Sequence, residues 1–183
     1  LVKARGNGNI GQFVKRIQFN LTSGNLTAAE QECDKQKGSV ANVIKSGLKT
    51  YRAMQDEKTL NKDQKMLAIQ KEVEESTALE LPMLQRNLPI LATLAPIGTL
   101  LGLIGTVLGM IRAFAALANA GAPDQTALSS GISEALINTA LGISTSAFAI
   151  IFYNLFSNRV DQITYAMDEA GFSIIQDFQA TEK

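Results

Sequence analysis

The sequence predicts an all-α integral membrane protein, a helical hairpin whose long helices extend into a cytoplasmic helical domain. Two apolar runs, Leu88–Ile111 and Ile132–Leu155, each contain 24 residues. At about 1.5 Å per residue, such a helix is roughly 36 Å long, which crosses a hydrocarbon core of ~30 Å with some tilt. The first run has no charged residue, and Glu134 is the only charged residue of the second. No alternating pattern typical of a strand appears anywhere in the chain.

These runs divide the chain into segments on the two sides of a membrane. We expect a cytoplasmic helical region, a membrane helix, a periplasmic loop, a second membrane helix and a cytoplasmic helical extension, at residues 1–86, 87–117, 118–127, 128–156 and 157–183. Pro123 interrupts the short loop. Of the 17 Lys and Arg residues, 14 precede Leu88, and such residues collect on the cytoplasmic side of membrane helices. Both ends of the chain are therefore assigned to the cytoplasm.

Apolar periodicity and capping patterns predict four helices before the first membrane run. They cover residues 10–21, 27–37, 40–51 and 61–80. Thr27 and Glu30 match a capping box for the second helix, and Asn61 or Asp63 is the candidate cap of the fourth. After the second membrane run, apolar residues recur at spacings of three and four, which predicts that this helix continues and packs on the N-terminal helices. They are Val160, Ile163, Met167, Ala170, Ile174 and Phe178.

Few residues in the chain are suited to catalysis or metal binding. The sequence has no His, and its one cysteine, Cys33, permits neither an intrachain disulfide nor a cysteine metal site. Gly6, Gly8 and Gly11 spell G-x-G-x-x-G, but that pattern indicates a nucleotide site only after a strand and within a βαβ unit. A flexible linker is the preferred interpretation. We therefore expect no enzyme, cofactor or metal, and a membrane enzyme is the weakest of the functions considered.

Four glycines in the first membrane run are spaced four, three and four residues apart, so they share one narrow face of the helix. They are Gly98, Gly102, Gly105 and Gly109. Small residues let two helix backbones approach closely in lipid, and this face is expected to pack against another helix. Because this face and the polar face of Glu134 each need a protein neighbour, and one hairpin cannot satisfy both, we also expect a ring-like homo-oligomer.

The second membrane run carries a polar face. Measured from Glu134 at about 100° per residue, Thr145, Asn138 and Thr139 lie near 20°, 40° and 140°. Polar groups in an apolar helix face protein or water, and an acid within the membrane is a functional candidate by default. The favoured role for Glu134 is therefore pore-facing. The alternative is an interfacial carboxylate near the start of the helix.

Several motifs in these runs resemble the ExbB/TolQ/MotA proton-channel family, with the ExbB and TolQ branch the more similar. The matching segments are Ala95-Pro96-Ile97-Gly98, Gly102-Leu103-Ile104-Gly105-Thr106-Val107, Gly131-Ile132-Ser133-Glu134-Ala135-Leu136 and Thr139-Ala140-Leu141-Gly142. The resemblance implies a pentamer around two single-helix ExbD/TolR-like proteins, with Thr106, Thr139 and Glu134 lining the lumen. We add Asn138, Thr99 and Thr145 as lumen candidates. Family members have a membrane helix before the cytoplasmic segment, and this sequence does not contain it. Either the sequence is a fragment, or only the last residues of that helix, Leu1-Val2, remain.

Two functions of different classes follow from this sequence. The first is a proton-channel subunit of an inner-membrane motor that uses proton-motive force to energise an envelope process such as outer-membrane transport, with a TonB-like protein as a further partner. The second is a non-conducting membrane scaffold assembled through its glycine face. Membrane lipids are expected partners, and nucleic acid is not. Whether the ion is H⁺ or Na⁺, and which process is energised, stays open at this point.

Overall fold

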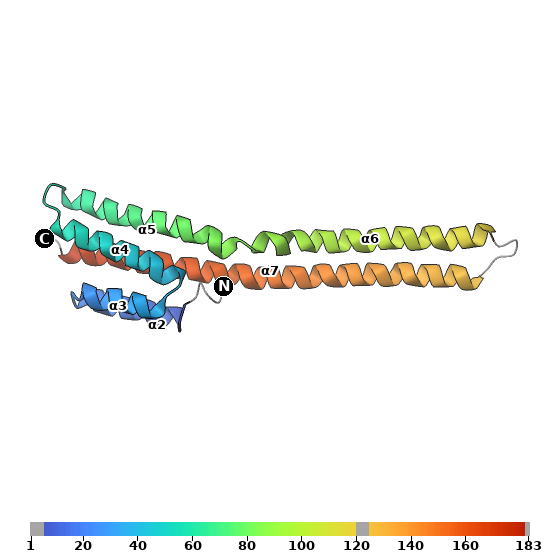
Figure 1. The fold of residues 1–183 in the computed structure, drawn as a ribbon, viewed down its shortest axis with the longest axis horizontal. Coiled ribbons are helices and arrows are strands. Elements are labelled where there is room, and N and C mark those ends of the chain that lie inside the picture. Colours follow the sequence, from blue (N-terminus) through green and yellow to red (C-terminus); the bar gives the residue numbers. More distant parts are fainter. Residues whose placement is uncertain (1–5, 120–124, 182–183) are drawn as a thin grey trace. The chain divides into compact units, whose positions relative to one another are not determined.

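The computed structural model describes residues 6–119 and 125–181, and all regular structure within these ranges is helical (Figure 1). The helices are α2 (Ile10–Thr22), α3 (Leu26–Gln36), α4 (Ser39–Asp56), α5 (Lys62–Gln85), α6 (Leu88–Asn119) and α7 (Gln125–Thr181). They form two compact units, Leu1–Arg86 with Asn158–Lys183, and Asn87–Ser157. We call these the helical unit and the hairpin unit. The loop proline, Pro123, lies outside the described residues.

Two helical segments are long and apolar enough to cross a membrane, and they contain α6 and α7. Large apolar side chains cover their outer surfaces, among them Leu100, Leu103, Ile143 and Ile151, each about half exposed or more. In water an exposed apolar surface of this kind would favour aggregation, whereas a helix surrounded by lipid is expected to have it. α7 continues without a break to Thr181, as its sequence predicts.

Asparagine side chains cap the starts of α2, α3 and α5. Asn61 accepts a hydrogen bond from the Gln64 backbone N–H, and the Gln64 side chain accepts one from the Asn61 backbone N–H. Of the two predicted cap candidates the cap is therefore Asn61, and it forms a capping box that was not predicted. The capping box at Thr27 is wrong, because Asn25 caps α3 by accepting from Ala28 N at 3.0 Å. Asparagine is the stronger N-cap, and it follows Gly24, whose φ of 69° ends the preceding turn.

The G-x-G-x-x-G segment begins at the first described residue, and its last glycine lies inside α2. The elements that follow it in residues 6–119 are all helices, so this range holds no βαβ unit. Gly6 is pressed against the end of α3, where an added Cβ would lie 1.9 Å from the Lys37 carbonyl oxygen. Asn7 N donates to the Gln36 carbonyl at 2.6 Å. Gly6 therefore packs this segment against the end of α3, which differs from both the nucleotide-binding and the flexible-linker interpretations.

The C-terminal part of α7 forms the centre of the helical unit. All six residues of its predicted apolar stripe are buried, which confirms that prediction. Tyr51 of α4 meets Phe178 edge to face with ring centroids 4.9 Å apart, and its hydroxyl donates to Asp177 at 3.0 Å. Val73 of α5 fills the space that Gly47 and Gly171 leave open, since an added Cβ would come within 2.8 Å of it at either glycine.

A charge introduced into this stripe should destabilise the protein. Ile163 and Met167 are 5% and 0% exposed, so replacing both by Asp buries carboxyl groups with no designed partner. We expect the melting temperature of the solubilised protein to fall by roughly 10 °C. Tyr165→Asp is the matched control, because Tyr165 is 71% exposed on the same helix. Equal melting of the two variants would contradict this packing.

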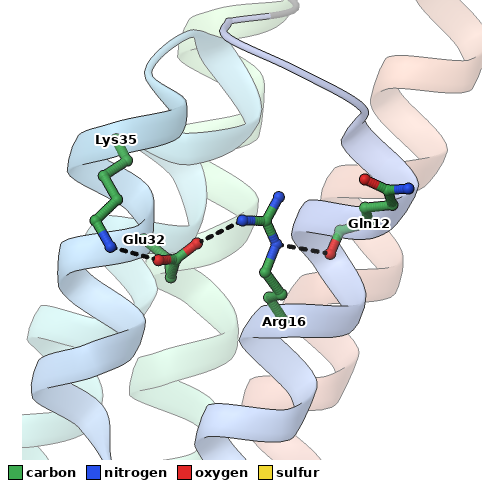
Figure 2. A network of polar contacts seen from close by, with 4 residues as sticks. All are labelled: Gln12, Arg16, Glu32 and Lys35. Carbon is green, nitrogen blue, oxygen red and sulfur yellow. Dashed lines mark hydrogen bonds and ion pairs between the residues drawn. The ribbon is translucent and has the colours of Figure 1, made fainter.

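Surface charges join α2 to α3 (Figure 2). Glu32 accepts from Lys35 Nζ at 2.7 Å and from Arg16 Nη1 at 3.0 Å, and Arg16 Nε also donates to the Gln12 carbonyl. The hydrogen bond from Lys35, followed by the charges of Lys35 and Arg16, lowers the pKa of Glu32. Because a lowered pKa favours the ionised form, this contribution is present near neutral pH and is lost as the pH falls through the carboxyl range.

The single cysteine should be unreactive in the folded protein. Cys33 is 2% exposed, and burial, reinforced by the charge of Asp34, raises its thiol pKa from 9.0 to about 12. The thiolate is the nucleophile, so we expect negligible iodoacetamide labelling at pH 8 until the chain is unfolded. Because the folded state favours the neutral thiol, the contribution of Cys33 to the free energy of unfolding is fully present below pH 9. It declines as the pH rises from 9 toward 12, where the thiol ionises in the unfolded chain first. Rapid labelling of the native protein would contradict this assignment.

Candidate functional site

The hairpin unit is held together by close backbone contact between α6 and α7. An added Cβ at Gly142 would lie 2.7 Å from both the Gly102 Cα and the Gly98 carbonyl oxygen. An added Cβ at Gly109 would lie 2.8 Å from the Ala135 Cβ, and one at Gly131 would lie 2.8 Å from the Ala113 Cβ. Backbone atoms cannot move aside as a flexible side chain does, so the helices need small residues at these positions.

The structure thus places all four predicted glycines of α6 against α7 of the same chain. Sequence reasoning identified this row but missed its counterpart on α7. That counterpart consists of Gly131, Ala135, Gly142 and Ala149. Their spacings of four and seven residues follow the same helical face, and this regularity was the signal that could have identified them. Because the glycine face is occupied within one chain, it gives no argument for a ring of several chains.

The two central threonines meet across this contact. Thr106 Oγ1 and Thr139 Oγ1 lie within hydrogen-bonding distance of each other, although the residues are 33 positions apart in sequence. Thr106 Oγ1 also lies 3.1 Å from the Gly102 carbonyl, and Thr139 Oγ1 lies 3.3 Å from the Ala135 carbonyl. Both side chains are half-buried.

The hydroxyl protons of Thr106 and Thr139 can be arranged in more than one way. Each hydroxyl has one proton to donate and two lone pairs. If Thr106 donates to Thr139, then Thr139 donates to the Ala135 carbonyl; in the reverse orientation Thr106 donates to the Gly102 carbonyl. The pair therefore has two possible proton arrangements. A switch between them reverses the direction of its O–H bonds, which is the property that a hydrogen-bonded proton relay requires.

A second polar cluster lies near the loop-side end of the hairpin. Glu134 Oε1 is 3.2 Å from Arg112 Nη1, and the two side chains are 54% and 68% exposed. One turn further along α7, the Asn138 side chain packs directly over Gly105, whose added Cβ would lie 2.7 Å from the Asn138 Cβ. Thr145 is exposed and donates to the Leu141 carbonyl at 2.8 Å.

Asn138 and Thr145 border a shallow groove between the two helices. Its floor is glycine backbone and its walls are leucine and isoleucine side chains, and the lining residues are Gly98, Leu101, Gly102, Ile104, Gly105, Leu108, Asn138, Leu141, Gly142 and Thr145. Neither Thr106 nor Thr139 lines it. The groove and the threonine pair therefore lie on different sides of the helix contact.

Helix geometry explains this separation. On α7, the small residues that contact α6 lie about 60–100° from Glu134. Thr139 lies beyond them at about 140°, and Glu134 lies before them. On α6, Thr106 and Arg112 likewise flank the glycine row on opposite sides. We call these sides the threonine edge, with Thr106, Thr139 and the exposed Thr99, and the acidic edge, with Glu134, Asn138, Thr145 and Arg112. The structure therefore divides the six predicted lumen residues between two edges of one hairpin.

Within residues 6–119 and 125–181, no group of three His, Cys, Asp or Glu side chains is arranged to hold a metal ion. The described site consists of hydroxyl groups, one amide and one ion pair. These groups can donate and accept protons or orient water, and they do not form a nucleophile–base pair.

The chain was also compared with known proteins. Residues 35–169 match the model of the MotA/TolQ/ExbB proton channel family, a range that includes most of the chain and the whole hairpin unit. No individual curated protein matches the chain. This family is a membrane-associated transport family and not a class of enzymes. A hydroxyl pair between two apolar helices, next to a glycine contact, is in keeping with that result, and the chain belongs to the MotA/TolQ/ExbB proton channel family.

Proposed function

We propose that this chain is a proton-conducting subunit of an inner-membrane motor. Membership of the proton channel family suggests the channel role, and the observation that supports it most directly is the hydroxyl contact between Thr106 and Thr139. Hydroxyls are neutral and both donate and accept, so they pass or solvate a proton in an apolar passage without the cost of a fixed charge. The threonine edge is the proposed lumen side.

The titrating acid is expected on a partner chain. Glu134 is the only acidic residue in the two apolar runs, and in the structure it is paired with Arg112 on the other edge. We therefore propose that about five copies of the chain surround two copies of an ExbD/TolR-like single-helix protein that carries an acid opposite the threonines. The energy of proton flow would drive an envelope process such as outer-membrane transport, through a TonB-like protein.

The alternative is a non-conducting scaffold whose glycine face assembles helices. In the structure this face joins α6 and α7 of one chain, so it gives no support for joining separate chains. A ring is still proposed, because the amide of Asn138 lies deeper in the second apolar run and needs protein or water beside it. Native mass spectrometry of the gently solubilised complex should show several copies of this chain; a monomer alone would contradict the ring.

Proton flux decides between channel and scaffold. We would purify the complex from its native membrane through a tag on this chain and reconstitute it into liposomes that contain a pH-sensitive dye. After an external acid pulse under a membrane potential, the lumen of these liposomes should acidify faster than that of empty liposomes. Acidification at the rate of empty liposomes, from complexes of verified composition, would contradict the channel.

A further inference from the structure

The segment from Leu88 to Ser157 contains three charged residues, Arg112, Asp124 and Glu134. The structure describes two of them, and these two form an ion pair between α6 and α7 at 3.2 Å. Arg112 has no role in the hydroxyl relay. Its pairing with the only acid of the apolar runs needs a separate explanation.

The pair lies close to the loop-side boundary of the hydrocarbon core. Arg112 is about 12 residues, or roughly 18 Å along the helix, from the middle of the first apolar run. Glu134 is about ten residues, or roughly 14 Å, from the middle of the second. Half of a ~30 Å core is about 15 Å, so both side chains are positioned where hydrocarbon gives way to headgroups or water.

At this boundary each charge could extend toward headgroups or water by itself, yet the two side chains meet each other. Arginine side chains near helix ends commonly extend to the interface by themselves. Here the guanidinium instead crosses to the neighbouring helix and meets the carboxylate. Removal of one member of such a pair leaves the other charge uncompensated, whereas removal of both leaves a neutral site.

Glu134 is also badly placed to exchange protons with the hydroxyl pair of its own hairpin. It lies on the acidic edge, across the glycine contact from Thr106 and Thr139. Its described polar contact is Arg112, and the next polar side chain along its edge is the amide of Asn138, which does not titrate. The arrangement is that of a fixed ion pair and not of a carboxyl that hands protons to the relay.

We propose that Arg112 is a positioning residue, the built-in counter-ion of Glu134, and that proton passage depends on the neutrality of this ion pair and not on proton uptake by Glu134. The inference rests on the proposed channel function. It assigns Arg112 a role in the same assembly: a neutral loop-side end presents no net charge of either sign to ions or to the partner's acid near the passage.

A double-mutant cycle in the reconstituted complex tests this. Arg112→Gln and Glu134→Gln should each reduce proton flux by about tenfold or more, because each leaves one uncompensated charge. The double variant Arg112→Gln/Glu134→Gln should recover to within about threefold of the unmodified complex, and so should the exchange Arg112→Glu/Glu134→Arg. Ser133→Ala is the control; Ser133 is exposed, lies next to Glu134 and faces away from α6.

The outcomes separate this inference from the proposed function. If the unmodified complex conducts but the double variant is as inactive as Glu134→Gln, Glu134 itself is required and the counter-ion role is overturned. Flux unchanged in Arg112→Gln would overturn it as well. If the unmodified complex does not conduct, the channel function fails, and thermal melting of the same variants then tests the counter-ion role. Melting temperatures of both single variants below that of the neutral double variant support the role. A double variant that melts no higher than either single variant overturns it.

Discussion

Replacing either central threonine by valine should abolish most proton flux while the complex still assembles. Valine keeps the branched shape of threonine but removes the oxygen, so neither hydroxyl can relay a proton to the other. We expect flux to fall roughly 100-fold for Thr106→Val and for Thr139→Val, the scale typical of losing a positioned proton-transfer group. The measurement is the acid-pulse assay with the reconstituted complex.

The structure also explains why these variants should fold. In Thr106→Val, the remaining Thr139 hydroxyl still donates to the Ala135 carbonyl at 3.3 Å, and in Thr139→Val, Thr106 still donates to the Gly102 carbonyl at 3.1 Å. No buried donor is left without an acceptor, so expression and melting should change little. Serine at either position restores the oxygen and should recover part of the flux.

Thr99→Val is a graded comparison, because Thr99 lies seven residues before Thr106 on the same edge but is exposed and has no hydroxyl partner across the helix contact in the described structure. A smaller loss is expected there than at Thr106. Wild-type flux from both central valine variants would refute the relay and leave Thr106 and Thr139 as residues of helix packing.

The helices themselves could be predicted from local patterns. The stripe from Val160 to Phe178 was identified from its spacing alone, and every member is buried. The start of α5 was likewise predicted from neighbouring residues, with Asn61, the observed cap, as one of two candidates. Both depend on contacts within a few turns of one helix or on one helix face, where sequence spacing determines geometry.

The site was less predictable, because it depends on how two helices are turned toward each other. Angles around α7 placed Glu134 and Thr139 about 140° apart, and a broad polar face was the simplest interpretation. They did not show that α6 contacts the positions between them, at Gly142 and Ala135. That contact divides the face into two edges. The partner of Glu134 was missed for the same reason, since Arg112 follows the apolar run and reaches Glu134 only in the paired hairpin.

The other large effect is expected at Gly142, where the two backbones are closest. Even Gly142→Ala places a methyl group 2.7 Å from the Gly102 Cα and from the Gly98 carbonyl oxygen, so the helices must separate. Overpacking of this kind costs about 1–3 kcal/mol. Gly142→Leu should destabilise the hairpin more. It should also separate Thr106 from Thr139, because the Gly142–Gly102 contact and the threonine pair belong to the same contact between α6 and α7. Melting of the complex and proton flux should therefore fall together.

Ala140→Leu is the matched control for Gly142→Leu, because Ala140 is exposed and faces away from α6 only two residues earlier on the same helix. Added bulk there extends into the surroundings of the hairpin and should leave flux close to that of the unmodified complex. If Gly142→Leu melts normally and conducts normally, the packing of α6 against α7 does not depend on this contact. Loss of flux with normal melting would instead assign Gly142 to the conducting path itself, since the hairpin would then be intact without its glycine.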